Sequence, residues 1–259
     1  MVYLKWFSLC YLCVVFLSLG YSFARATQER ESPIGQSWAT ARRDSARLAP
    51  DPVTFSKIAI VQVYAAPTYG WRGRVALHPW IIFKRAGDTQ YTRYDVIGWG
   101  SSNVVRRNYA IPDGFWFGSQ PALLVSHQGP EAEAMIPQIE SAISRYPFAH
   151  TYHAWPGPNS NTFMAHIGRE VPALALDLPS NAIGKDYRPL LSPVGLPPSG
   201  RGVQVSLLGV LGVTAGIQEG LEFNILGLNL GVDIASPALR LPFIGRVGFT
   251  GGPGVAEKE

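Results

Sequence analysis

The sequence predicts an α+β fold, in which an antiparallel sheet carries two main helices and a small β extension follows at the C-terminus. Three observations predict this class. Between residues 57 and 125, apolar, aromatic and β-branched runs of strand length are separated by Pro and Gly. Residues 130–146 and 159–169 change to helical spacing. After a Pro-rich stretch, apolar and polar residues alternate again toward the C-terminus.

Residues 1–26 are typical of a signal peptide or of a membrane anchor. The stretch from Trp6 to Ala24 carries no charge, and its length just suffices to cross a hydrocarbon core of about 30 Å as a helix. Ala24-Arg25-Ala26 fits the small-x-small pattern of a cleavage site, although the arginine weakens the match. We expect the globular part to lie in the bacterial periplasm, held at the inner membrane or released after cleavage. The larger number of Lys and Arg after the segment favours the opposite orientation, so both stay open.

Charge and cysteine content exclude several classes of function. The formal net charge is +4, but residues 1–50 hold six Lys and Arg against three acids. The remaining residues are nearly neutral, so we expect no nucleic-acid partner. Cys10 and Cys13 both lie in the apolar N-terminal segment, which leaves the rest without a thiol nucleophile or a disulfide. No His, Asp or Glu cluster has ligand spacing, and we expect neither a metal nor a cofactor.

A polar linker and three strands are expected next. Residues 27–54 are polar, rich in Ser, Arg and Ala, and end in a Pro-Asp-Pro motif, which is typical of a linker. Strands are expected at residues 57–65, 74–85 and 91–99 because these runs are rich in β-branched and aromatic residues. Residues 115–125 are expected to be half strand and half loop.

Two helices and a turn-rich loop follow the strands. Apolar residues between 130 and 146 fall on one face of a helix, and Pro137 predicts either a kink or a later start. Residues 150–155 are expected to form a short strand. Asn159 is expected to cap a second helix that begins at Ser160.

Residues 191–259 are expected to form a β-hairpin extension, a hairpin or meander of two or three strands that could be added to the edge of the main sheet. A strand at 203–208 precedes a turn at 216–220. Residues 221–234 then alternate in a phase that slips at Leu226-Gly227, as in a β-bulge.

Ser160 and His78 are the candidate catalytic residues. A serine at a helix start gains little from the helix dipole, so it needs a base, and His78 at the start of a strand could supply it. Backbone N–H groups of the helix start could form an oxyanion hole. Asp95 and Tyr94 are both candidates to orient His78. Alternatively, Ser160 only caps a helix, and His78 is a hydrogen-bonded histidine at a strand start.

Five further residues are candidates for ligand binding. Asn159 and Asn161 flank Ser160, while Tyr69, Arg72 and Trp80 surround His78 in the sequence. Aromatic and basic side chains together could hold a carboxylate or a phosphate. Alternatively, a loop packs its aromatic rings while its arginines face water.

Three segments resemble a known family. They are Tyr-Gly-Trp-Arg-Gly at 69–73, His-Pro-Trp at 78–80, and Trp-Pro-Gly-Pro-Asn-Ser-Asn-Thr-Phe at 155–163. Together they resemble an uncharacterised bacterial family, domain of unknown function 3750, over about residues 55–190. More distantly, a histidine on an early strand and an Asn-x-x-x-Phe motif at a helix start are similar to circularly permuted papain-like proteins. These are the NlpC-type, PPPDE and lecithin:retinol acyltransferase families, in which a cysteine stands where this chain has Ser160.

The resemblance implies a permuted papain-like arrangement over residues 55–190 and leaves three functional hypotheses. The first is an envelope-associated serine hydrolase or acyltransferase acting on envelope peptides or acyl groups, with Ser160 as nucleophile and His78 as base. The second is a catalytically inactive relative that binds an envelope ligand or a partner protein. The third is a membrane-associated structural protein whose strands at 203–247 dock on a partner, which predicts an exposed apolar patch there.

Overall fold

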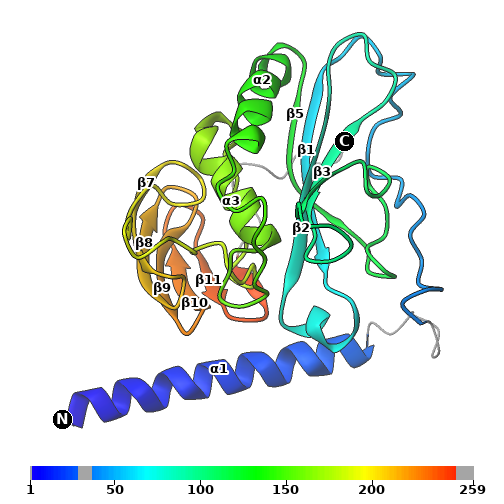
Figure 1. Ribbon diagram of the computed structural model, residues 1–259. Coiled ribbons are helices and arrows are strands. Elements are labelled where there is room, and N and C mark those ends of the chain that lie inside the picture. The colour runs from blue at the N-terminus through cyan, green and yellow to red at the C-terminus, as the bar shows by residue number, and fades with distance from the viewer. Residues whose placement is uncertain (1, 29–36, 249–259) are drawn as a thin grey trace.

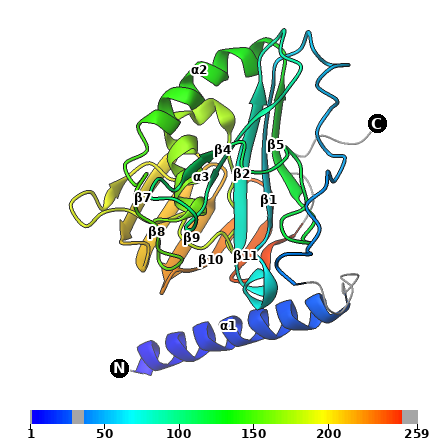
Figure 2. The same ribbon diagram turned by 45° about the vertical axis from the view of Figure 1, so that its right-hand side comes forward.

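The protein has an α+β fold in three layers, with two helices between a five-stranded and a seven-stranded sheet (Figures 1 and 2). The computed structural model describes residues 2–28 and 37–248. Part of the predicted linker (29–36) and of the predicted extension (249–259) lies outside the described residues. The two antiparallel sheets and the helices between them confirm the α+β class predicted from the sequence.

The first sheet is antiparallel, with the order β4-β3-β2-β1-β5. Its strands are β1 (Ile60–Pro67), β2 (Leu77–Lys84), β3 (Thr92–Val96), β4 (Val105–Arg107) and β5 (Ala122–Gln128). A short 3₁₀ helix, η1 (Gly70–Arg74), connects β1 to β2. The sequence did not predict β4, which at three residues is too short to show an alternating pattern.

Two helices cover one face of this sheet. They are α2 (Pro130–Ser144) and α3 (Ser160–Glu170), and α3 is followed by the 3₁₀ helix η2 (Pro172–Leu174). Pro137 lies inside α2, which begins at Pro130, so the later start was wrong. The short strand expected at 150–155 was also wrong. The His153 N–H donates instead to the Pro158 carbonyl at 2.8 Å, which folds the segment back on itself as a turn.

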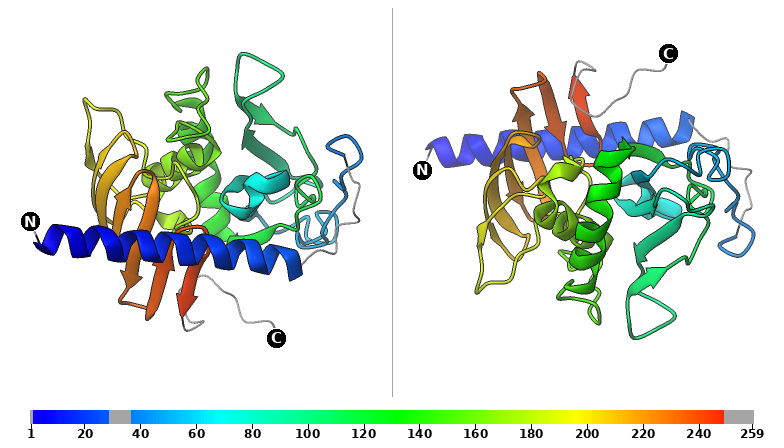
Figure 3. Two further views of the ribbon diagram at one scale, coloured as in Figure 1. Left: turned by 90° about the horizontal axis from the view of Figure 1, so that it is seen from below. Right: turned by 90° about the horizontal axis from the view of Figure 1, so that it is seen from above.

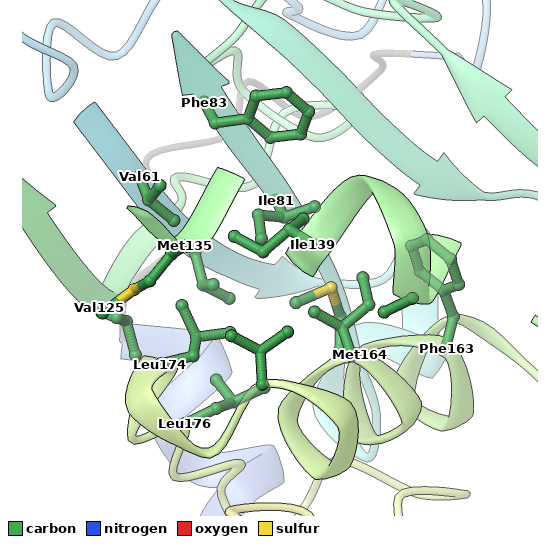
Figure 4. Close-up of a cluster of buried hydrophobic side chains, with 14 of the residues drawn as sticks. Val61, Ile81, Phe83, Val125, Met135, Ile139, Phe163, Met164, Leu174 and Leu176 are labelled. Atoms are coloured by element: carbon green, nitrogen blue, oxygen red, sulfur yellow. The ribbon is translucent and has the colours of Figure 1, made fainter. Parts of the chain in front are cut away.

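The main core lies between the first sheet and the two helices (Figure 4). Val61, Ile81 and Phe83 from the sheet meet Met135 of α2 and Met164 of α3 there, and all five are buried. A second apolar cluster covers the opposite face of the sheet. Its buried members come from the strands and from the loops that cross that face: Ala41, Ile60, Tyr64, Ala66, Trp80, Ile82, Tyr91, Ile97, Trp116 and Phe117.

The C-terminal strands form a sheet of their own. This sheet is an antiparallel meander in the order β12-β11-β10-β9-β8-β7-β6. Its strands are β6 (Val194–Gly195), β7 (Gly202–Leu207), β8 (Leu211–Gly216), β9 (Gly220–Ile225), β10 (Leu228–Asp233), β11 (Ala238–Leu241) and β12 (Gly245–Gly248). The expected C-terminal meander is therefore present, but it has seven strands instead of two or three and forms a separate sheet instead of extending the edge of the first one.

The expected β-bulge at Leu226-Gly227 is a hairpin turn between β9 and β10. Leu226 and Gly227 have φ values of 55° and 78°, and Ile225 pairs with Leu228 directly across the turn. Two consecutive residues with positive φ match the twist of the flanking strands in a two-residue hairpin. A phase slip of this kind arises from a turn as readily as from a bulge, which explains the error.

The seven-stranded sheet is polar on its inner face and apolar on its outer face. Along β7, the buried residues are Gln204 and Ser206, whereas Val203 and Val205 are exposed. The strand pairing extends this division across β7 to β12. We call the following outward residues the outer apolar face: Val203, Val205, Leu207, Leu211, Val213, Ala215, Leu221, Phe223, Ile225, Leu228, Leu230, Val232, Leu239, Leu241 and Val247.

Charged and amide side chains attach the inner face of this sheet to the loop after η2. Asp186 accepts hydrogen bonds from Gln204, Asn224 and Asn229 at 2.7–3.0 Å. Lys185, which is fully buried, donates to Glu222. Buried polar groups require such partners, so this network fixes which face of the sheet points inward.

Helix α1 (Val2–Gln28) lies along one end of the molecule (Figures 1 and 3). The Tyr11 hydroxyl donates to the Ile225 carbonyl at 2.9 Å, and the Ser22 hydroxyl donates to the Arg74 carbonyl. By length and composition, α1 can cross a membrane, a test that an N-terminal signal sequence also passes. Helix α1 thus has the length and composition of a signal peptide or a membrane anchor.

Candidate functional site

His78 is held in a buried pocket of aromatic and charged side chains at the start of β2. Its ring stacks on Trp116 with the ring centroids 3.8 Å apart and an angle of 8° between the planes. Its Nε2 lies 3.0 Å from Oδ1 of Asp95 on β3. Because an ionised carboxylate only accepts hydrogen bonds, Nε2 carries the hydrogen and Nδ1 keeps the lone pair.

Asp95 is bound by Arg93 as well as by His78. Arg93 Nε and Nη2 donate to the two carboxylate oxygens at 2.7 and 2.8 Å, and both residues are at most 1% exposed. Burial alone would raise the pKa of Asp95, but the charge of Arg93 and the hydrogen bonds from His78 and Arg93 outweigh it. The pKa of Asp95 therefore lies below its usual range, and the carboxyl group is ionised.

The same burial keeps His78 neutral. Desolvation lowers the pKa of His78 below 6.5 by more than the hydrogen bond to Asp95 raises it. A neutral imidazole with a free Nδ1 lone pair has the protonation state that a general base requires.

The start of α3 is fixed by its capping residue. The Asn159 side chain accepts from the N–H groups of Asn161 and Thr162, and the Thr162 hydroxyl accepts from the Asn159 N–H. Asn159 Nδ2 also donates to the carbonyls of Ala154 and Ile183 at 3.1 and 3.0 Å. Asn159 therefore acts as the N-cap expected from the sequence.

Ser160, the first residue of α3, is buried, and two of its hydrogen-bond donors, the hydroxyl and the backbone N–H, have no acceptor among the described residues. The N–H groups of Asn161 and Thr162 already bind Asn159. The oxyanion hole expected at this helix start is thus reduced to the Ser160 N–H.

The side chain of His78 and the helix that begins at Ser160 lie on opposite faces of the first sheet. In β2, Ile81 packs into the main core beneath the helices, whereas Trp80 belongs to the second cluster on the opposite face. His78 has the same strand phase as Trp80 and stacks on Trp116 of that second cluster. Helix α3, by contrast, packs into the main core. Within the described residues, no hydrogen bond joins Ser160 to His78.

Helix α3 is joined to strand β2 through the backbone of the residue that precedes His78. Asn161 Nδ2 donates to the Leu77 carbonyl at 3.2 Å and to the Ile183 carbonyl at 2.8 Å. This places the start of α3 beside the first residue of β2, next to His78 in the chain. The structure therefore brings His78 together with Asp95 and brings Ser160 together with Asn159 and Asn161, as two separate groups.

The other three residues predicted to bind a ligand, Trp80, Tyr69 and Arg72, differ in burial and in position. Trp80 is fully buried, donates from Nε1 to the Pro112 carbonyl, and lies under the Arg93 guanidinium, so it presents no free face to a ligand. Tyr69 is half-buried, with its ring edge against Phe117. Arg72 lies in η1, on the side of the molecule where α1 runs.

Sequence reasoning missed Arg93 and Trp116. Arg93 stands two residues before Asp95, and residues i and i+2 of a strand share a face, which is a signal that could have found it. Trp116 lies in a loop after β4, and nothing in the local pattern places it over His78. Tyr94, the other candidate partner of His78, points to the opposite face and stacks on Phe83.

Two surface hollows are lined by residues other than Ser160 and His78. One hollow is bounded by Pro137, Arg145 and Glu170, and another by Arg201 and Ile217. In residues 2–28 and 37–248, no group of three or more His, Cys, Asp or Glu side chains could hold a metal ion. The site thus consists of a buried His-Asp-Arg group and a capped helix start.

The fold and this site define an α+β protein with a histidine–aspartate pair on one sheet face and a serine at a helix N-terminus. The chain belongs to the family described as protein of unknown function (DUF3750), whose model matches residues 58–187. The match covers the first sheet, both central helices, and Lys185 and Asp186. Comparison with curated proteins and with solved structures finds no match.

Proposed function

We propose that this chain is a membrane-associated protein of the bacterial envelope that acts by docking, through the outer apolar face of its C-terminal sheet. The observation that carries the proposal is the inverted sheet, in which outward positions on six neighbouring strands are apolar. Contiguous exposed apolar surface of this kind marks an interaction site in soluble proteins. Helix α1 supplies the membrane association, and the globular part lies on the periplasmic side.

The separation of Ser160 from His78 favours docking over catalysis. A serine nucleophile needs a base within hydrogen-bond reach, at about 2.6–3.2 Å or through one water. The strand phase of His78 directs its ring away from the face on which α3 packs. The His78-Asp95-Arg93 group then acts as a structural network that fixes β2 against β3.

Protection of the outer apolar face tests the docking function. A cysteine at Phe223 in otherwise cysteine-free full-length protein is expected to react slowly with a membrane-impermeant maleimide in isolated envelope membranes. A cysteine at Thr89, in the exposed turn between β2 and β3, is expected to react fast. Both should react equally after urea denaturation. If the cysteine at 223 reacts as fast as that at 89 in native membranes, the face is open to water and the docking function is wrong.

A serine hydrolase or acyltransferase is the second candidate, favoured by the free hydroxyl and N–H of Ser160 and by the neutral His78. In this mechanism Ser160 Oγ attacks a carbonyl carbon and His78 Nδ1 accepts its proton. The carbonyl oxygen becomes an oxyanion held by the Ser160 N–H. When it collapses, the alcohol or amine leaves with the proton from His78. Water or an acceptor alcohol then releases the acyl group. This mechanism requires a rearrangement that brings His78 Nδ1 to Ser160.

A fluorophosphonate probe separates the two candidates. We expect no labelling of the wild-type chain, because among the described residues no hydrogen bond joins Ser160 to His78. Labelling that persists in Ser144→Ala but disappears in Ser160→Ala would instead establish the serine enzyme. Ser144 is an exposed serine at the end of α2 and controls for non-specific reaction.

A further inference from the structure

The outer apolar face lies next to helix α1, whose N-terminal part is exposed. Trp6, which precedes Tyr11 in α1, is 62% exposed. Tyr11 joins α1 to the carbonyl of Ile225, at the end of β9. In Figures 1 and 3 the N-terminal part of α1 extends past the seven-stranded sheet, on the side that faces away from α3. Helix α1 therefore projects in the direction that the outer apolar face presents.

We propose that the outer apolar face rests on the lipid bilayer that α1 enters, so that lipid acyl chains, and not a protein, cover the sheet. The proposal rests on the docking function above and names its partner. It assigns two roles to one membrane contact: α1 inserts, and the sheet lies on the same leaflet.

Coverage of both surfaces by one partner favours lipid over a second copy of the chain. Two sheets packed face to face would bury the outer apolar face but would leave in water the N-terminal part of α1, which extends past the sheet. A bilayer on this side removes the face and this part of α1 from water at once. Transfer of apolar side chains from water to lipid is favourable, so an aliphatic sheet face adds to the affinity that α1 provides.

The chemistry of the face also suits acyl chains. Protein–protein interfaces combine apolar and polar area, with about 65% apolar area even in homodimers. The outward positions of β7 to β12 are all apolar, and the charged residues of these strands are turned inward. Strands β8 and β9 pair with a neighbour on both sides along most of their length, so their backbone groups need no water.

An exposed tryptophan lies at the end of the face where α1 runs. Trp155 is 54% exposed and donates from Nε1 to the Leu226 carbonyl in the β9–β10 turn, next to Ile225, which accepts from Tyr11 of α1. Tryptophan is enriched where membrane and water meet, which is the depth that this arrangement assigns to the ring of Trp155.

Quenching by labelled lipid tests the proposal on the full chain. Single cysteines at Val205, Phe223 and Leu239, in a Cys10→Ala, Cys13→Ala background, are labelled with the fluorophore NBD and reconstituted in phosphatidylcholine–phosphatidylglycerol vesicles. A nitroxide on the lipid acyl chain is expected to quench most of the emission at all three sites. The label at Thr89, in the turn at the far end of β2, is expected to stay unquenched.

A matched pair of variants separates lipid contact from mere nearness to α1. With the label at Val205, Phe223→Glu is expected to reduce the quenching, because it places a charge in the contact, whereas Phe223→Leu is expected to preserve it. Circular dichroism confirms that both variants remain folded.

Each other outcome overturns the proposal. The maleimide experiment then shows whether the docking function is overturned as well. Unquenched sheet labels that remain protected in envelope membranes would assign the face to a protein and leave the docking function standing. Oxidative cross-linking of Phe223→Cys chains would then identify a second copy as the partner. Unquenched and unprotected labels would overturn both. Quenching at Thr89 equal to that on the sheet would show non-specific insertion and also refute the proposal.

Discussion

Replacing Arg93 with methionine is expected to lower the free energy of unfolding by about 3–5 kcal/mol. Arg93 supplies two of the hydrogen bonds to the buried Asp95 carboxylate, and its Nη1 also donates to the Ile111 carbonyl at 2.7 Å. Removal of the guanidinium leaves an ionised carboxylate in the core with the neutral His78. Denaturant unfolding of the full chain in a mild detergent, followed by tryptophan fluorescence, measures the loss.

Two controls define the cause of this loss. Arg107→Met removes an exposed arginine from the neighbouring strand β4 and is expected to change the stability by no more than about 0.5 kcal/mol. Arg93→Met combined with Asp95→Asn removes the stranded charge, so the double variant is expected to be more stable than Arg93→Met alone. Equal effects of Arg93→Met and Arg107→Met would contradict the buried ion pair.

Replacing Lys185 with methionine is expected to cost a comparable amount, about 3–5 kcal/mol, in the second sheet. Burial would lower the pKa of Lys185, but the charges of Asp186 and Glu222 outweigh it and raise the pKa, so the ammonium group is charged. Its loss leaves Glu222 with Arg240 at 3.5 Å as its remaining close cation among the described residues. The attachment of the sheet to the loop after η2 is weakened as a result.

A double-mutant cycle tests this interpretation. Glu222→Gln in the Lys185→Met background removes the stranded carboxylate, and the double variant is expected to regain part of the stability. Lys57→Met, at an exposed lysine, is the matched control. A double variant no more stable than Lys185→Met would show that the loss comes from packing and not from the unpaired charge.

The sequence predicted the order of most elements because each had a local signal. Runs of β-branched and aromatic residues indicated β1, β2 and β3, and Asn159 as a capping residue indicated the start of α3. No local signal indicated which face of the C-terminal sheet points toward the interior. Alternation distinguishes two faces of a strand but does not say which one is buried. That choice depends on Lys185 and Asp186, which lie outside the strands and meet them only after folding.

The sequence predicted which residues belong to the candidate site, but it did not predict how they lie relative to one another. The choice between Asp95 and Tyr94 depended on the register of β2 against β3, in which Ile81 pairs with Tyr94. That register places Asp95 opposite Trp80 and therefore on the face of His78. The position of Ser160 depended on which face α3 covers, and a single chain segment carries no information about that.

The inverted sheet also affects what calorimetry can detect. The heat-capacity change of unfolding grows with newly exposed apolar area and falls with newly exposed polar area. Opening the seven-stranded sheet in lipid-free solution uncovers mainly the polar inner face, so its melting contributes little to the heat-capacity step. The calorimetric signature of this protein therefore belongs mostly to the five-stranded sheet and the two helices that cover it.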